Sequence, residues 1–190
     1  MPSAFGKPVT TANRFGVVAT PSVWTLVTTL TASNSSSLTV TGLASTSYKN
    51  YALVFSGLLP AGASSFYVYY STDNGATFPA GATSYDYIWA FNAAGTVLHA
   101  FNDLGSFGYL LSTVSSDTRT SAGGVAYFTY GVVASARAQL TGTLTSYNGT
   151  RQEVVISASN YNSATEVNAL RFLMTGGNIT NGTIKVYGIT

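Results

Sequence analysis

The feature that most constrains the fold is the alternation of side chains along residues 167–189, VNALRFLMTGGNITNGTIKVYGI. Its first half alternates between two faces, and Ile184, Val186 and Ile189 follow after a loop rich in Gly and Asn. A period of two is typical of a β-strand, and Gly and Asn supply the turn between two strands. We therefore expect a closing β-hairpin that is paired into the core sheet.

Similar segments recur along the chain, whereas no segment longer than a turn has the apolar spacing of a helix. Trp24 and Trp89 stand among alternating apolar residues, so we expect both side chains to be packed. Strands are expected within residues 24–30, 38–40, 51–58, 65–71, 85–100, 125–133, 136–145, 153–159 and 167–174, the first two forming a hairpin or the start of a Greek key. Strands repeating roughly every ten residues predict an all-β fold. We expect residues 23–190 to form one antiparallel, jelly-roll-like β-sandwich domain.

Residues 1–22 differ from the rest because they contain three prolines and two glycines and have no sustained apolar period. They predict an extended N-terminal arm, either a disordered leader or a segment that lies on a partner. Phe5 and Phe15 are the expected anchors of such a segment, since disordered tails usually have few aromatic residues. The first residues lack the apolar core of a signal peptide. No stretch approaches the roughly 18 consecutive apolar residues of a membrane-spanning helix, so no membrane partner is expected.

Charge and composition exclude further classes of partner. Only 7% of the 190 residues are charged, and the formal net charge is +2. No run of Lys or Arg could follow a phosphate backbone, so a nucleic-acid partner is not expected. A weakly charged surface causes little repulsion between copies, which favours self-association or packing into a large assembly.

Groups for catalysis and metal binding are scarce. The chain has no Cys and a single His, His99, which cannot form a zinc site of His and Cys ligands within one chain; three copies of His99 around a symmetry axis are the remaining option. A glycosidase needs two neighbouring carboxylates, and no local motif pairs Asp86 with Asp103. We expect a non-enzymatic protein without a cofactor or metal.

Residues 71–78, STDNGATF, have the spacing of an Asp-box turn. In this pattern Asp73 accepts backbone N–H groups, Gly75 adopts a positive φ and Phe78 packs beneath the turn. In sialidases and related propellers the box recurs from blade to blade and is structural. Here it occurs once, without an arginine cluster that would mark a sialidase site, so we expect a structural role.

Aromatic side chains are the main resource for binding, with 13 Tyr and two Trp. Flat rings suit sugars and protein partners. Tyr67, Tyr69, Tyr85 and Tyr87 are candidates for one exposed aromatic face on neighbouring strands, which would be an interface or a glycan platform. The alternative is that these rings belong to the core and to ordinary sheet surface.

Four segments resemble a group of small structural proteins of tailed bacteriophages: WTLVTTLTAS, YKNYALVFSGLLPA, YYSTDNGATF and the segment 167–189. The C-terminal pattern of that group is close to A-I-R-F-x-x-S-G-N-I-x-S-G-T-I-K-L-Y-G-I. The residues that fit it are Ala169, Arg171, Phe172, Gly177, Asn178, Ile179, Gly182, Thr183, Ile184, Lys185, Tyr187, Gly188 and Ile189. The departures are Leu170, Gly176, Asn181 and Val186. The resemblance extends over residues 24–190 and is weak between 94 and 145.

The resemblance implies a virion structural protein, since members of the group are described as tail-fibre, head-fibre or decoration proteins. It implies a β-sandwich that forms a homotrimer, resides in the virion and is fixed to capsid or tail components by the N-terminal arm, and it brings no catalytic residues. We expect the capsid-decoration or head-fibre type. One alternative is a tail-fibre receptor-binding protein that recognises a host surface glycan, with an exposed aromatic site away from the arm. The other is a polysaccharide depolymerase, which would need a carboxylate pair in a groove.

Overall fold

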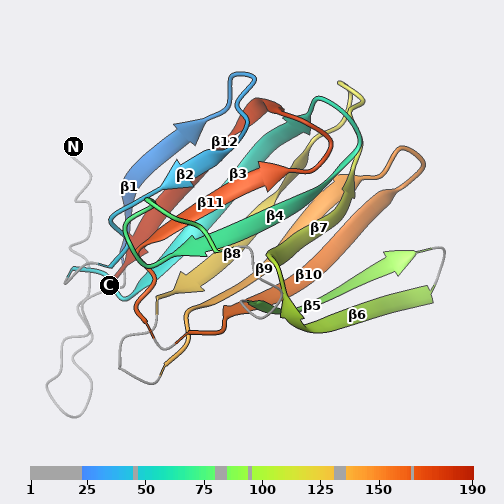
Figure 1. Ribbon diagram of the computed structural model, residues 1–190. Helices are drawn as coiled ribbons and strands as arrows, with labels where there is room; N and C mark the ends of the chain where they lie inside the picture. Colours follow the sequence, from blue (N-terminus) through green and yellow to red (C-terminus); the bar gives the residue numbers. More distant parts are fainter. Residues whose placement is uncertain (1–22, 45–46, 80–84, 94–95, 131–135, 164) are drawn as a thin grey trace, which may run out of the picture.

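The computed structural model describes residues 23–44, 47–79, 85–93, 96–130, 136–163 and 165–190, and between 85 and 105 it describes the backbone only. The described part consists of twelve strands without a helix, in two antiparallel sheets packed face to face (Figure 1). The expected all-β sandwich is confirmed. No helix in this part of the chain is long and apolar enough to cross a membrane.

The larger sheet has eight strands and the smaller has four. The larger sheet follows the order β1 (Trp24–Thr31), β12 (Ile179–Ile189), β3 (Asn50–Pro60), β8 (Ala122–Thr129), β9 (Gln139–Tyr147), β10 (Gln152–Tyr161), β5 (Tyr85–Ala93) and β6 (Thr96–Gly105). The smaller sheet follows the order β2 (Leu38–Val40), β11 (Ala169–Met174), β4 (Ser64–Ser71) and β7 (Gly108–Val114). Only β7 is missing from the strands expected from the sequence.

Strands that follow one another in the chain repeatedly lie in opposite sheets. This holds for β1 and β2, β3 and β4, β7 and β8, and β11 and β12. The order β1-β12-β3-β8 of the larger sheet therefore repeats as β2-β11-β4-β7 in the smaller one. Each of these connections is an arch that crosses between the layers, as Figure 1 shows for β11 and β12.

The expected closing hairpin is wrong, because β11 pairs with β2 and β4 whereas β12 pairs with β1 and β3. Residues 24–30 and 38–40 do not form a hairpin for the same reason. A period of two describes a strand but does not identify its partner, and each of these strands buries an apolar face against the other sheet. The jelly-roll topology is not confirmed, since a jelly roll has eight strands in all and the larger sheet alone has eight here.

The centre of the sandwich is a cluster of three phenylalanine rings. Phe55 lies edge-on to Phe66 and to Phe172, with ring centroids 5.6 Å apart in both pairs, and Phe66 stacks on Phe172 at 6.0 Å. All three side chains are buried. The buried Tyr51 hydroxyl donates to the carbonyl oxygen of Leu43, so this ring carries no unsatisfied polar atom into the core.

Residues of the C-terminal pattern hold the arches in place. The Asn178 amide nitrogen donates to the backbone and side-chain oxygens of Asn34, at 2.9 and 3.1 Å, which ties the β11–β12 arch to the β1–β2 arch. The chain passes so close to Gly182 that an added Cβ would lie 2.7 Å from backbone atoms of residues 57 and 58. A Cβ on Gly188 would lie 2.3 Å from the Tyr48 ring. The pattern thus marks close packing.

Candidate binding surfaces

The Asp73 turn joins β4 to the segment that follows it. The Ser71 hydroxyl donates to Asp73 Oδ1 at 2.6 Å, and Thr77 donates its backbone N–H to Oδ1 at 2.9 Å and its hydroxyl to Oδ2 at 2.6 Å. These hydrogen bonds lower the pKa of Asp73 from 3.8 to about 2. The bond from Ser71 has the largest effect, and those from Thr77 have the next largest. Gly75 has a φ of +89°, as the spacing of the turn predicts.

The same turn positions an aromatic ring and a neighbouring strand. A Cβ on Gly75 would lie 3.8 Å from the Phe78 ring, so Phe78 packs beneath the turn. The guanidinium carbon of Arg171 lies 4.3 Å from the centroid of this ring. The Asn74 backbone N–H donates to Asn168 Oδ1 at 2.7 Å, just before β11 begins. These contacts fasten the turn to the smaller sheet.

Replacing Asp73 with alanine is expected to lower the melting temperature at pH 7 by roughly 2 to 4 °C, because the turn loses its shared acceptor. The carboxylate has a lower pKa in the folded state than in the unfolded state, so its contribution is complete above about pH 4 and disappears as the pH falls through 2. Thermal melts of both proteins at pH 7 and pH 2 measure this. The difference should shrink in acid, and an unchanged difference would contradict the assigned role.

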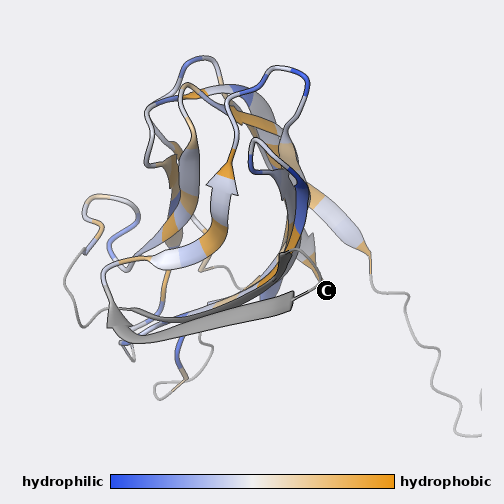
Figure 2. Cartoon of the chain, turned by 90° about the vertical axis from the view of Figure 1, so that its right-hand side faces the viewer, coloured by the Kyte–Doolittle hydropathy of each residue, from blue (hydrophilic) through white to orange (hydrophobic). Residues whose placement is uncertain are grey.

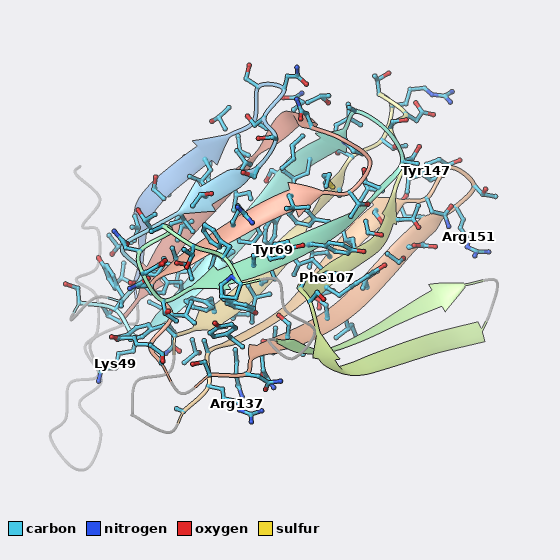
Figure 3. The ribbon with its side chains drawn as sticks, viewed as in Figure 1. Lys49, Tyr69, Phe107, Arg137, Tyr147 and Arg151 are labelled. Atoms are coloured by element: carbon cyan, nitrogen blue, oxygen red, sulfur yellow. The ribbon has the colours of Figure 1, made fainter. Side chains whose placement is uncertain are left out.

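An aromatic cluster covers part of the outer side of the smaller sheet. Phe66, Val68 and Tyr70 of β4 point into the core, so the alternating Tyr67 and Tyr69 lie on the outer side, half-buried. Their rings contact Phe107, which precedes β7, and Tyr109, which lies in β7. We define the aromatic face as Tyr67, Tyr69, Phe107 and Tyr109. Figure 3 labels Tyr69 and Phe107.

The rings of the aromatic face are in close mutual contact. Tyr67 stacks on Phe107 with a centroid distance of 3.7 Å and an interplanar angle of 10°. Tyr109 lies 5.3 Å from Tyr67, and Tyr69 lies 6.4 Å from Phe107. The four rings therefore form one continuous, partly exposed aromatic cluster, in which only Tyr67 and Phe107 are parallel and the other pairs are tilted by 40° to 56°. Exposed aromatic rings of this kind can contact a sugar ring or a protein side chain.

The expected grouping of four tyrosines on neighbouring strands is wrong in its strand pairing. Tyr85 and Tyr87 lie in β5 of the larger sheet, which pairs with β10 and β6 rather than with β4. Their side chains are outside the described ones. Sequence reasoning missed Phe107 and Tyr109, although their spacing of two residues in GSFGY is the signal that would have found them.

Arg171 of β11 borders the aromatic face. It lies opposite Tyr69 in the strand register, and its guanidinium carbon is 5.3 Å from the Tyr69 ring centroid. Burial raises the pKa of the Tyr69 hydroxyl, although the positive charge of Arg171 acts in the opposite direction. No carboxylate of the described residues forms an ion pair with this guanidinium.

The outer side of the larger sheet carries a second, apolar surface. Trp24 was expected to be packed, yet it is 43% exposed and contacts the rings of Tyr127 and Tyr187 at 6.0 and 5.9 Å. Further exposed or half-buried apolar side chains lie on the same side of the sheet, on strands from β1 across to β10. We define the apolar face as Trp24, Leu26, Val54, Val125, Tyr127, Val154, Ile156 and Tyr187.

The apolar face is broad and almost without charge. Ile156 is 62% exposed and Leu26 is 51% exposed, at opposite ends of the surface. In the register row that runs from β12 to β10, Lys185 is followed by Val54, Val125, Thr143 and Ile156. In Figure 2 the strand that follows the grey N-terminal trace, which is β1, has hydrophobic parts coloured orange. Contiguous exposed apolar surface of this kind marks an interaction site.

Asp73, Asp117 and Glu153 have structural partners, whereas the exposed Glu166 has none among the described residues. Asp117 forms an ion pair with Arg119 at 2.6 Å, and the buried Glu153 accepts hydrogen bonds from Asn148 and Ser112. No group of three potential metal ligands occurs in the described part of the chain.

The remaining candidates for chemistry lie in β5 and β6. The register places Asp86 and Asp103 on these two paired strands, close to the irregular step between the pairs Tyr85–Gly105 and Tyr87–Asn102. His99 lies opposite Ala90 in the same pair of strands. The side chains of Asp86, Asp103 and His99 are outside the described ones, as is the whole of the N-terminal arm with Phe5 and Phe15.

Comparisons with known protein families, curated proteins and solved structures gave no match.

Proposed function

We propose that this chain is a non-enzymatic structural protein of a bacteriophage virion, of capsid-decoration or head-fibre type, which is attached through residues 1–22. The observation that carries the proposal is the apolar face, a broad surface that crosses six strands and contains little charge. Such a surface is costly for a free monomer and is explained by burial against protein. The resemblance to phage structural proteins supplies the kind of particle.

The place where the N-terminal segment joins the sandwich supports attachment on this side. Val23 and Trp24, the first described residues, are 54% and 43% exposed and belong to or adjoin the apolar face. They lead into β1, which is the edge strand of the larger sheet. A virion protein that holds residues 1–22 would therefore lie at the β1 edge of the apolar face and leave the rest of that face to other copies of the chain.

Copies of the chain are expected to associate through the apolar face, as a homotrimer. Ile156→Glu places a charge in its most exposed apolar position and should convert the trimer to monomer, because burying an unpaired carboxylate is costly. Light scattering at about 50 µM measures the mass. The control is Thr39→Glu, at an exposed position of the smaller sheet, which should stay trimeric. A monomeric wild-type protein would contradict the proposal.

Deletion of residues 1–22 is expected to leave the sandwich folded and to abolish incorporation into particles. All twelve strands begin after residue 22, so the core keeps its contacts and the melting temperature should stay within a few degrees. Co-sedimentation with assembled particles measures attachment. Loss of folding would show that the segment belongs to the core, and retained incorporation would place the attachment elsewhere.

The aromatic face favours a second candidate function, recognition of a host surface glycan by a tail-fibre protein. It lies on the outer side of the smaller sheet, whereas the apolar face lies on the outer side of the larger one. The two surfaces can therefore be used at the same time, one for assembly and one for binding.

A further inference from the structure

The charge of Arg171 has no counterpart in the described structure. Its guanidinium carbon lies 4.3 Å from the Phe78 ring centroid and 5.3 Å from that of Tyr69, and these rings hold the side chain in place. Neither a carboxylate nor a hydrogen-bond acceptor among the described residues pairs with it. A half-buried positive charge held by rings alone is available to an external anion.

The nitrogen atoms of the guanidinium differ in their surroundings. Nε is covered and has no hydrogen-bond partner, whereas the two Nη nitrogens are not among the covered atoms that lack one. Two parallel N–H groups of an arginine can bind both oxygens of a carboxylate. The geometry therefore permits an end-on, two-point contact through the Nη groups.

Tyr69 connects this cation to the rest of the aromatic face. The same ring is 5.3 Å from the guanidinium carbon and 6.4 Å from the Phe107 ring centroid. Phe107 is in turn stacked on Tyr67, so the aromatic cluster adjoins the cation. A ligand that matches both parts has an apolar ring face with a carboxylate at its edge.

We propose that Arg171 and the aromatic face together bind a saccharide that carries a carboxylate, such as a hexuronic or sialic acid residue. The sugar ring packs against the exposed sides of the Tyr67–Phe107 stack and of Tyr109, and its carboxylate accepts hydrogen bonds from the Arg171 Nη groups. The proposal rests on the second candidate function, glycan recognition, and adds the class of sugar. A neutral sugar would leave the cation unused, and an inorganic anion would leave the rings unused.

The test compares saccharides that differ only in charge. Tetragalacturonate and sialyllactose are titrated into the full-length protein by calorimetry, each beside its neutral methyl ester. We expect the acid to bind roughly tenfold or more tightly than the ester, because a charge-assisted two-point contact is lost on esterification. Arg171→Gln should abolish this preference, and Arg171→Lys, which keeps the charge without the fork, should retain part of it.

Lys185→Gln is the matched control, since it removes the same charge from the outer side of the larger sheet, and its preference should equal that of the wild type. Melting curves of all variants check folding, and Arg171→Lys keeps the test valid if Arg171→Gln unfolds. Equal binding of acid and ester that is lost in Tyr67→Ala would overturn the Arg171 site and leave glycan recognition standing. Failure of all four saccharides to bind would overturn both, and tight binding of inorganic phosphate alone would show an anion site without sugar specificity.

Discussion

Replacing Phe172 with alanine is expected to lower the free energy of unfolding by about 3 to 5 kcal/mol, because the substitution leaves a cavity at the centre of the sandwich. The Phe172 side chain is fully buried, and its ring contacts Phe55 and Phe66 at centroid distances of 5.6 and 6.0 Å. These two rings come from β3 and β4, which lie in different sheets, so neither can move into the space without disturbing its own strand. Urea denaturation followed by circular dichroism measures the loss.

Leu173 provides the matched control for this prediction. It is the next residue of β11, lies on the outer side and is only half-buried. Leu173→Ala removes a side chain of comparable chemistry from the same strand, and we expect a loss of about 1 kcal/mol or less. Equal losses at the two positions would mean that the smaller sheet does not pack against the larger one as described.

Gly182→Ala is expected to destabilise the protein by about 3 to 5 kcal/mol, through two effects that add. Its φ of +114° is a conformation that residues with a Cβ rarely adopt. A Cβ would also lie 2.7 Å from the Gly57 carbonyl oxygen and from two backbone atoms of Leu58, on the neighbouring strand β3. Backbone atoms within a sheet cannot yield as the end of a side chain can, so overpacking adds to the strain.

Gly42→Ala separates these two effects. Gly42 also has a positive φ, +71°, but no atom lies within 4 Å of an added Cβ. Only the conformational cost applies there, and we expect about 1 kcal/mol. Thermal or urea unfolding of both variants makes the comparison. A Gly182→Ala loss no larger than that of Gly42→Ala would contradict the close approach of β12 and β3.

The strands could be predicted from the sequence, but their partners could not. Alternation reports that a segment is extended and has two faces, which is why β3, β4 and β9 to β12 were located. It does not distinguish a hairpin from an arch, because β11 and β12 would each bury one apolar face in either arrangement. The start of β7 was hidden by the glycines and aromatic residues of GSFGY, which resemble a loop by composition.

The exposure of Trp24 was missed for a local reason. Trp24, Leu26 and Leu30 alternate in the sequence as if on one face. The register of β1 against β12 shifts between Leu26 and Thr28, which marks a β-bulge at Val27. One extra residue reverses the alternation, so Leu30 packs against the core while Trp24 and Leu26 face outward.

The candidate surfaces were predictable only where they are local. The Asp73 turn is formed by residues within one short segment, so spacing alone indicated its acceptor and its glycine. The aromatic face joins β4 to Phe107 and Tyr109, far along the chain, and the sequence identified only the β4 half. Arg171 belongs to a recognisable pattern, yet its two ring neighbours follow from strand pairing that no pattern contains.

The arches also determine the order in which the molecule can be completed during synthesis. β1 is paired in the larger sheet by β12 alone, and β3 lies between β12 and β8. Until the ribosome has released β12, β1 has no partner and β3 keeps an unpaired edge. The nascent chain therefore exposes apolar strands until β12 has been synthesised, and folding must wait for contacts between distant segments, which makes it slow. Aggregation on the ribosome, or early capture by another chain, is the hazard that this topology creates.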